Sequence, residues 1–174
     1  MHEAGGSRIF ALIIGIDRYI SVKKAILKGA ARDARNMHLL LKANFGVPDD
    51  HICLLCDQYA TRARIIEELK GLATNPNIQR GDAIIIYFAG HGNRASVPPE
   101  WQFGREEVKT ICPVDEYGSP DSDVHGIPDI TINALLYKLS LAKGENIVGV
   151  IIGEYLLAPV QRSLNADSYP RLLS

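Results

Sequence analysis

The chain has 174 residues, of which 47% are hydrophobic and 22% are charged, and its formal net charge is −1. This length suits one domain with a full core. The balance of 19 basic against 20 acidic side chains predicts neither nucleic acid nor an anionic membrane as a partner. No apolar run is long enough to span a bilayer, the first residues do not resemble a signal peptide, and three cysteines fit reduced thiols. We therefore expect a cytoplasmic domain.

Apolar runs alternate with segments of helical period along the chain. We expect buried strands at residues 8–16, 51–56, 83–89 and 146–152, and a shorter strand at 108–114. Helices are expected at 30–45, closed by Gly46, from Thr61 to about residue 72, and from Asp129 or Thr131 to Lys143. This order predicts an α/β fold with a mainly parallel sheet of about four main strands between layers that hold three helices.

The last part of the chain lacks such a pattern. Residues 156–174 show no clear period and contain two prolines, so we expect one domain over residues 8–155 followed by an irregular, non-native or disordered tail. We then expect the sheet to end early and the domain to be truncated. Residues 146–152 become an exposed edge strand, where a protein partner could complete the sheet.

His91 is the first candidate for chemistry. In open parallel sheets, ligands gather beyond the carboxyl ends of the strands, and His91 follows the strand at 83–89 between two glycines that allow a tight turn and leave the imidazole accessible. Such a histidine can act as a general acid or base near neutral pH. The alternative is a turn histidine that only bonds the backbone. The other segments at strand ends are Asp17-Arg18-Tyr19, Asp57-Gln58 and Gly153-Glu154-Tyr155.

Five segments, in order, resemble those of the caspase-like cysteine peptidases (peptidase C14 type), and most of all the type I metacaspases of fungi. They are 10–19 (FALIIGIDRY), 27–34 (LKGAARDA), 86–92 (IYFAGHG), 111–115 (ICPVD) and 126–133 (GIPDITIN). The resemblance covers residues 8–152. It implies a caspase-like α/β/α sandwich and a cysteine-type endopeptidase that hydrolyses peptides or proteins. It places His91 at the general base of a Cys–His dyad.

The nucleophile of that dyad is missing. The family carries it in Asp-Cys-Cys-His-Ser-Gly or a similar motif, directly after the strand that matches 146–152. This chain instead reads Ile152-Gly153-Glu154-Tyr155, and no cysteine follows Cys112. Because a thiolate must attack the scissile carbonyl, we expect the chain to be inactive as it stands. Whether it is an enzyme stays open. It is either a non-catalytic interaction module (a pseudoenzyme) or an incomplete version of an active peptidase.

The three cysteines that are present have structural interpretations. Cys53 and Cys56 form a C-L-L-C segment that suggests a redox or zinc site. However, residues three apart in a strand point to opposite faces, and no second ligand pair has matching spacing. We therefore expect both side chains to be buried in the core, where free cysteine behaves as a small hydrophobe. Cys112 is also expected to be structural.

The resemblance assigns roles to two acidic residues. Asp33 matches one acid of the pocket that gives metacaspases their preference for Arg or Lys before the cut, whereas the residues alone indicate a carboxylate favoured by a helix dipole. Asp129 matches a calcium-binding position, although Pro128 replaces the family's preceding acid. The alternative for this acidic stretch is solvated loop charge; its members are Asp115, Glu116, Asp121, Asp123 and Asp129. No cofactor is required, and calcium is suggested only by the resemblance.

A nucleotide-binding doubly wound domain is the remaining alternative. It is disfavoured because the first strand is not followed by G-x-G-x-x-G and the chain contains no G-x-x-x-x-G-K-[ST] segment.

Overall fold

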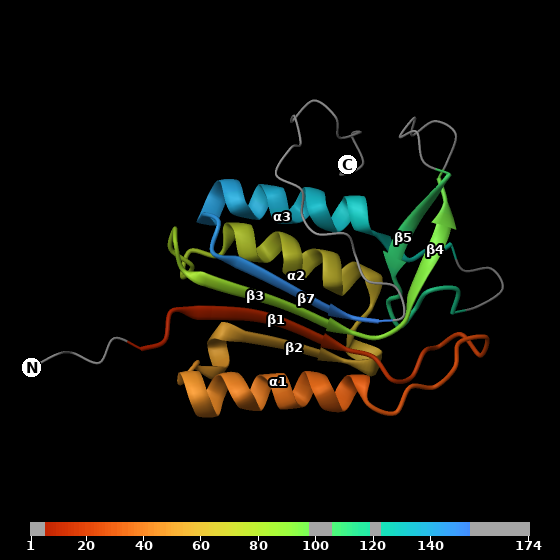
Figure 1. Cartoon of the computed structure of the whole chain (residues 1–174), viewed down its shortest axis with the longest axis horizontal. Coiled ribbons are helices and arrows are strands. Elements are labelled where there is room, and N and C mark those ends of the chain that lie inside the picture. The colour runs from red at the N-terminus through yellow and green to blue at the C-terminus, as the bar shows by residue number, and fades with distance from the viewer. Residues whose placement is uncertain (1–5, 98–105, 119–122, 154–174) are drawn as a thin grey trace, which may run out of the picture.

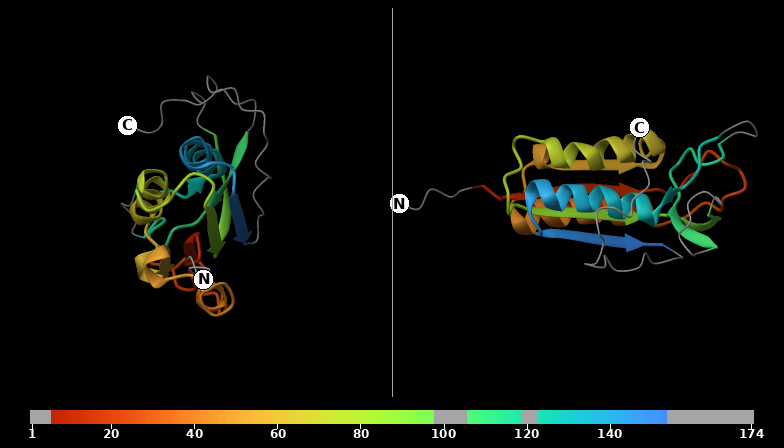
Figure 2. Two further views of the ribbon diagram at one scale, coloured as in Figure 1. Left: turned by 90° about the vertical axis from the view of Figure 1, so that its left-hand side faces the viewer. Right: turned by 90° about the horizontal axis from the view of Figure 1, so that it is seen from above.

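The computed structural model describes residues 6–97, 106–118 and 123–153. Four parallel strands form the main sheet in the order β2-β1-β3-β7. They are β1 (Ile9–Gly15), β2 (Ile52–Cys56), β3 (Ala83–Ala89) and β7 (Ile147–Ile152). Helix α1 (Ala30–Phe45) covers one face of the sheet, and α2 (Arg62–Thr74) and α3 (Asp129–Lys143) cover the other (Figures 1 and 2). The predicted three-layer α/β/α architecture is confirmed.

A second, antiparallel sheet continues from the carboxyl end of β3. It consists of β4 (Gly92–Ser96), β5 (Glu107–Ile111) and β6 (Ile127–Pro128). The strand expected at 108–114 is β5, which is shorter than predicted. Strand β4 was not predicted, because Gly92–Ser96 is polar and largely exposed and so lacks the apolar pattern that identifies a strand.

The helix ends follow the sequence signals with one exception. Gly46 closes α1 in the left-handed conformation at φ 59°, and Thr61 caps α2 by accepting a hydrogen bond from the Arg64 N–H at 3.3 Å. The expected cap of α3 is wrong. Pro128 precedes the helix, and Asp129 is its first residue, with Oδ1 accepting from the Ile130 N–H at 2.8 Å.

Two apolar cores lie on the two faces of the main sheet. Alternate residues of β1 point to opposite faces, so Leu12 packs with Leu69 and Leu139 of α2 and α3, while Ile13 packs with Ala34 of α1. Because both faces are covered, the central strands are continuous apolar runs.

Helix α1 begins very close to the end of β1. A Cβ atom added at Gly15 would lie 2.5 Å from Ala34 Cβ and 2.6 Å from the Ala30 carbonyl oxygen. Glycine is therefore required at position 15 for space. This close approach places the first turn of α1 beside the carboxyl ends of the strands.

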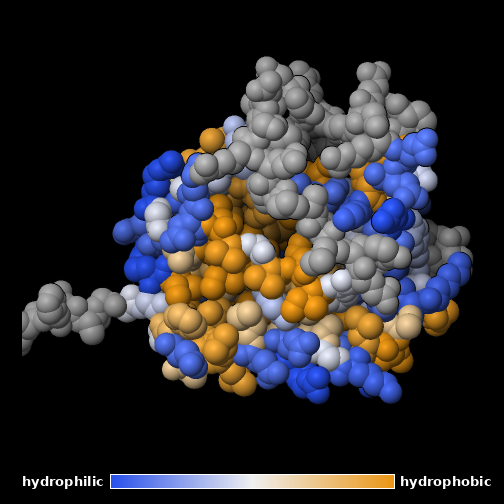
Figure 3. All heavy atoms as spheres, viewed as in Figure 1, coloured by the Kyte–Doolittle hydropathy of each residue, from blue (hydrophilic) through white to orange (hydrophobic). Residues whose placement is uncertain are grey.

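Strand β7 is an edge strand in the part of the chain that the structure describes, as expected. Val148 and Ile152 are 53% and 50% exposed, and apolar side chains gather in the middle of the face that Figure 3 shows. A partner at this edge stays a prediction. So does the domain boundary at 155, because residues 154–174 lie outside the described part of the chain.

Gly15→Ala tests the contact between β1 and α1. The added methyl group would have to displace helix backbone, so we expect a loss of about 2 kcal/mol or more in the free energy of unfolding. Gly71→Ala in α2 is the control. Nothing lies within 4 Å of its added Cβ, so a gain of about 0.5–1 kcal/mol is expected. Urea unfolding measures both, and equal stability of the two variants would contradict the packing described.

Candidate active site

A cavity of about 370 Å³ opens at the carboxyl ends of β3 and β7. Three segments far apart in the sequence form its walls: residues 27–30 with Asp33, residues 89–91, and Ile152 with Gly153. The parallel sheet brings these segments together, since the carboxyl ends of its strands share one edge.

His91 is held in one orientation in this cavity. Its Nε2 lies 2.8 Å from the Ala25 carbonyl oxygen. A carbonyl oxygen can only accept, so this contact assigns the hydrogen of the neutral imidazole to Nε2 and leaves the lone pair on Nδ1. The backbone on both sides is also fixed: His91 N–H donates to Tyr19 Oη at 2.7 Å, and the His91 carbonyl accepts from Cys112 N–H at 3.0 Å. Nδ1 is therefore the ring atom that can take a proton.

Gly90 makes the contact between Tyr19 and His91 feasible. A Cβ atom at Gly90 would lie 2.8 Å from Tyr19 Oη and 2.9 Å from Phe88 Cζ. Glycine is thus needed at this position for space, and its φ is not positive. Burial raises the pKa of Tyr19 above its ordinary value, although the hydrogen bond from His91 opposes the effect. The phenol therefore stays neutral beside the imidazole.

Asp33 lies in the first turn of α1 and lines the same cavity as His91. Its side chain is 46% exposed, and its Oδ1 is 3.9 Å from Arg32 Nε. The start of α1 is fixed by Asp17, whose Oδ1 accepts from the Ala30 N–H at 2.8 Å. Asp17 also accepts through its carbonyl from the Leu27 N–H at 2.9 Å, which closes the loop between β1 and α1.

None of the three thiols lines the cavity. Cys112 is fully buried; burial, reinforced by the charge of Glu116, raises the pKa of its thiol to about 12. Burial likewise raises the pKa of Cys53 to about 12. Cys53 and Cys56 pack on opposite faces of the sheet, as expected, but both are only partly buried. Since a thiolate is the reactive form, Cys112 and Cys53 are poor nucleophiles.

The acidic stretch is less solvated than the alternative interpretation expects. Glu116 and Asp129 are only 2% and 5% exposed, and Asp115 Oδ1 accepts from the Arg62 N–H at the start of α2. Solvated loop charge is thus wrong for Glu116 and Asp129. Asp123 is exposed, and Asp121 lies outside the described residues.

Asp129 belongs to no cluster of metal ligands within the described part of the chain. Among the described residues, no three His, Cys, Asp or Glu side chains converge on a point where they could hold a metal ion. The Asp129 carboxylate is instead engaged by the Ile130 N–H. Calcium dependence stays a prediction from the resemblance.

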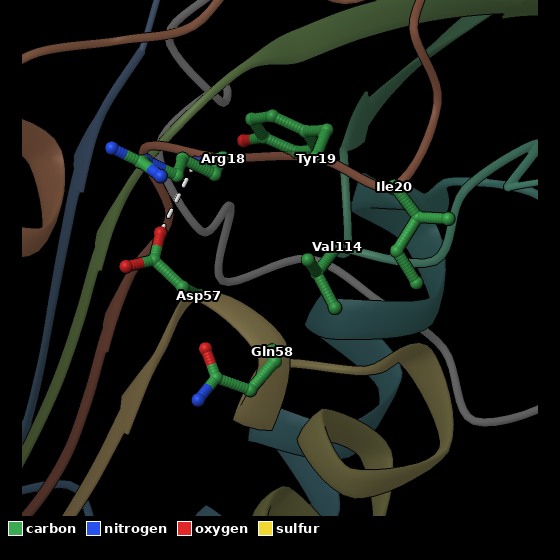
Figure 4. A pocket seen from close by; sticks show the side chains of 6 residues that line it. All are labelled: Arg18, Tyr19, Ile20, Asp57, Gln58 and Val114. Atoms are coloured by element: carbon green, nitrogen blue, oxygen red, sulfur yellow. Dashed lines mark hydrogen bonds between the residues drawn. The ribbon is translucent and has the colours of Figure 1, made fainter.

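A second hollow of about 370 Å³ lies at the ends of β1 and β2 (Figure 4). Its lining residues are Arg18, Tyr19, Ile20, Asp57, Gln58 and Val114. Asp57 has a positive φ of 47°, and its Oδ1 accepts from the backbone N–H groups of Asp17 and Arg18 at 2.8 and 3.0 Å. Asp57 thus joins the ends of two strands and holds the beginning of the loop that reaches His91.

Comparisons with known proteins identify the family of this chain. The family described as metacaspase, peptidase C14 domain, matches residues 10–150, so the chain belongs to this family and the predicted resemblance is confirmed. The chain is 28% identical to Metacaspase III c of Phaeodactylum tricornutum over 138 residues (75% of this chain and 39% of the relative). It is 31% identical to Metacaspase-1B of Aspergillus oryzae over 136 residues (72% and 31%).

The chain matches only part of its relatives. Metacaspase-1A of Aspergillus oryzae is 32% identical over 114 residues, which are 60% of this chain and 25% of that protein. Across these three curated relatives, the match spans 25–39% of their length. The crystal structure of protein GSU0716 from Geobacter sulfurreducens shares the fold, with a TM-score of 0.61 and 20% identity over 83% of this chain and 49% of that one.

The predicted site residues divide into two groups. His91 and Asp33 share one cavity, and Gly153 forms part of its wall, where an added Cβ would lie 2.9 Å from the Gly90 carbonyl oxygen. Asp129 does not line that cavity, and Glu154 lies outside the described residues. The catalytic and binding roles stay predictions.

No helix in the described part of the chain has the length and apolar character needed to cross a membrane.

Sequence patterns do not identify the residues that orient His91. Tyr19 belongs to a segment that the sequence predicts at a strand end, but no sequence pattern indicates its hydrogen bond to His91. Ala25 acts through its backbone carbonyl, which every residue type has, so no sequence signal could have found it.

The burial of Cys112 predicts low reactivity. Iodoacetamide at about pH 8 should alkylate Cys112 in the native protein at least ~100-fold more slowly than in urea, because the thiol is inaccessible and protonated. Mass spectrometry of tryptic peptides measures each cysteine separately. Alkylation of native Cys112 at the rate of a free thiol would contradict the buried position.

Proposed function

We propose that this chain is a metacaspase-family domain that binds peptides through an Arg or Lys side chain and does not cleave them. The observation that supports this most directly is the cavity itself. It holds an oriented imidazole at His91 and a carboxylate at Asp33, yet no thiol lines it.

The cavity has the groups that a basic side chain requires. The half-exposed carboxylate of Asp33 can accept charge-assisted hydrogen bonds from a guanidinium or ammonium group. Leu27 and Ile152 supply apolar wall for the aliphatic stem. Lys28 also lines the cavity, so recognition depends on the ligand placing its cation on the Asp33 side.

Peptide cleavage would need a nucleophile beside His91. In cysteine peptidase chemistry, the thiolate attacks the scissile carbonyl while the histidine transfers protons to and from the reacting groups. His91 can exchange a proton at Nδ1, but without a thiol no acyl-enzyme forms. The sequence holds no cysteine after Cys112, and Cys112 is buried with a protonated thiol. A bound peptide would therefore stay intact.

An incomplete version of an active peptidase is the second candidate. It is favoured by the small share of its relatives' length that the chain matches. Sequencing the transcript across the codons for residues 143–174 distinguishes the two. A form with a cysteine motif after Ile152 would support the peptidase, and the present sequence as the sole product would support the binding domain.

Peptide binding and cleavage are tested together. A fluorescein-labelled peptide with one central Arg should bind the chain, as measured by anisotropy, and the same peptide with Ala should bind at least ~10-fold more weakly because the charge pair with Asp33 is absent. Asp33→Asn should weaken binding of the Arg peptide by a similar factor. Asp50→Asn, at an exposed acid outside the cavity, should leave it unchanged.

The same mixtures are analysed for cleavage by mass spectrometry, with and without calcium. No product is expected. Turnover that disappears in His91→Ala would overturn the non-cleaving assignment, and equal affinity for the Arg and Ala peptides would overturn the proposed role of Asp33.

A further inference from the structure

An ion pair joins the loop that follows β1 to the segment that follows β5. Lys24 Nζ lies 2.6 Å from Glu116 Oε2, and the two side chains are 16% and 2% exposed. Lys24 Nζ also lies 3.3 Å from Cys112 Sγ and 5.7 Å from the ring centroid of Tyr19. The function proposed above uses neither Lys24 nor Glu116.

The Glu116 end of this pair is buried, and its backbone is held by a hydrogen bond. Its backbone N–H donates to the Pro113 carbonyl at 3.1 Å. Its carboxylate packs against the chain before β6, since a Cβ at Gly126 would lie 2.7 Å from Glu116 Oε1. Burial alone would lower the pKa of Lys24, but the contacts with Glu116 and Cys112 outweigh burial and raise it. The ammonium group therefore keeps its charge and stays paired.

The Lys24 end lies in the loop that follows β1, where the Lys24 N–H donates to the carbonyl of the buried Ser21 at 3.2 Å. Val22 and Ile26, on either side of Lys24, are 98% and 66% exposed. Backbone hydrogen bonds attach the loop nearer its ends, from the Ile20 N–H to the Val114 carbonyl and from the Leu27 N–H to the Asp17 carbonyl. The side chain of Lys24 thus attaches the middle of this loop to the segment that follows β5.

The residue after Lys24 carries the carbonyl that orients the imidazole. Ala25 O lies 2.8 Å from His91 Nε2, and nothing about the exposed Ala25 side chain fixes that carbonyl. Moreover, Cys112, which Lys24 contacts, donates its backbone N–H to the His91 carbonyl at 3.0 Å. Lys24 therefore bridges the two segments that contact His91.

We propose that Lys24 is a positioning residue: its ion pair with Glu116 holds the Ala25 carbonyl against His91 Nε2 and so keeps the neutral imidazole in the tautomer with its lone pair on Nδ1. Any effect on a bound peptide rests on the proposed function. The tautomer itself is a property of the free protein.

The tautomer is measured on the full chain, labelled with ¹⁵N-histidine, in the absence of peptide. At about pH 9, where an ordinary imidazole is neutral, the wild-type ¹⁵N shifts should show one dominant Nε2–H form for His91, identified by its loss in His91→Ala. In Lys24→Met the loop is released, and we expect a mixture of the two tautomers with the Nδ1–H form rising several-fold.

Three further variants keep the test decisive. Lys24→Met leaves a buried carboxylate unpaired and could unfold the protein, so Lys24→Met/Glu116→Gln, which removes both charges, is measured as well and should show the same mixture. Lys24→Arg keeps the charge and should restore the wild-type form. Lys23→Met, at the exposed neighbouring lysine, should change nothing.

A wild-type tautomer that persists in the folded double variant would overturn the proposal, and so would a mixture in the wild-type protein. Failure of the proposed function has a different signature, since it appears as absent binding of the Arg peptide and leaves the tautomer result unaffected.

Discussion

The hydrogen bond between His91 Nε2 and the Ala25 carbonyl is the contact that gives the cavity its chemical character. An imidazole can present either nitrogen as a base, and the acceptor on one side decides which nitrogen is left. The rest of the site supports this one bond. Tyr19 fixes the His91 backbone, and Asp17 secures the start of α1. The close contact of Gly15 with α1 places the first turn of this helix, which contains Asp33, beside the carboxyl ends of the strands.

The sequence predicts the scaffold well, because the physical cause of each main strand is local. Both faces of the sheet are covered, so β1 and β3 are continuous apolar runs, and Thr61 and Gly46 mark helix ends through side-chain and backbone preferences of their own. Strand β4 was missed because its residues are polar and it is held by pairing with β5. The cap expected of Asp129 failed because Pro128 supplies the extended residue before α3.

The site was predictable only in part. Asp33 and His91 share a cavity because both follow strands of one parallel sheet. Segments that follow parallel strands meet at the carboxyl edge of the sheet, so this proximity can be predicted from the sequence. The contacts that orient His91 follow no such rule. Ala25 contributes a backbone atom. Lys24 and Glu116 are separated by most of the domain in sequence, and the acidic stretch around Glu116 allowed an interpretation as solvated loop charge. Their burial arises from the packing of two loops, which no local pattern reports.

Strand β7 forms both the sheet edge and one wall of the cavity. Ile152 is half exposed while it lines that wall, and Gly153 approaches the Gly90 carbonyl too closely to carry a side chain without movement. The cavity therefore holds an oriented imidazole at His91 and a carboxylate at Asp33, and on the β7 side it presents the apolar Ile152 and the glycine at position 153. In the proposed function, the missing component is a thiol.

Ile152→Cys tests most directly whether the cavity lacks only a nucleophile. The new thiol would lie in the wall of the cavity that His91 lines, and its alkylation by iodoacetamide can be followed against pH by mass spectrometry of its own peptide. If His91 is poised as a base, the thiol should react at lower pH than an ordinary thiol, because the imidazole promotes the thiolate, and this advantage should disappear in Ile152→Cys/His91→Ala. The same pH profile with and without His91 would contradict the account.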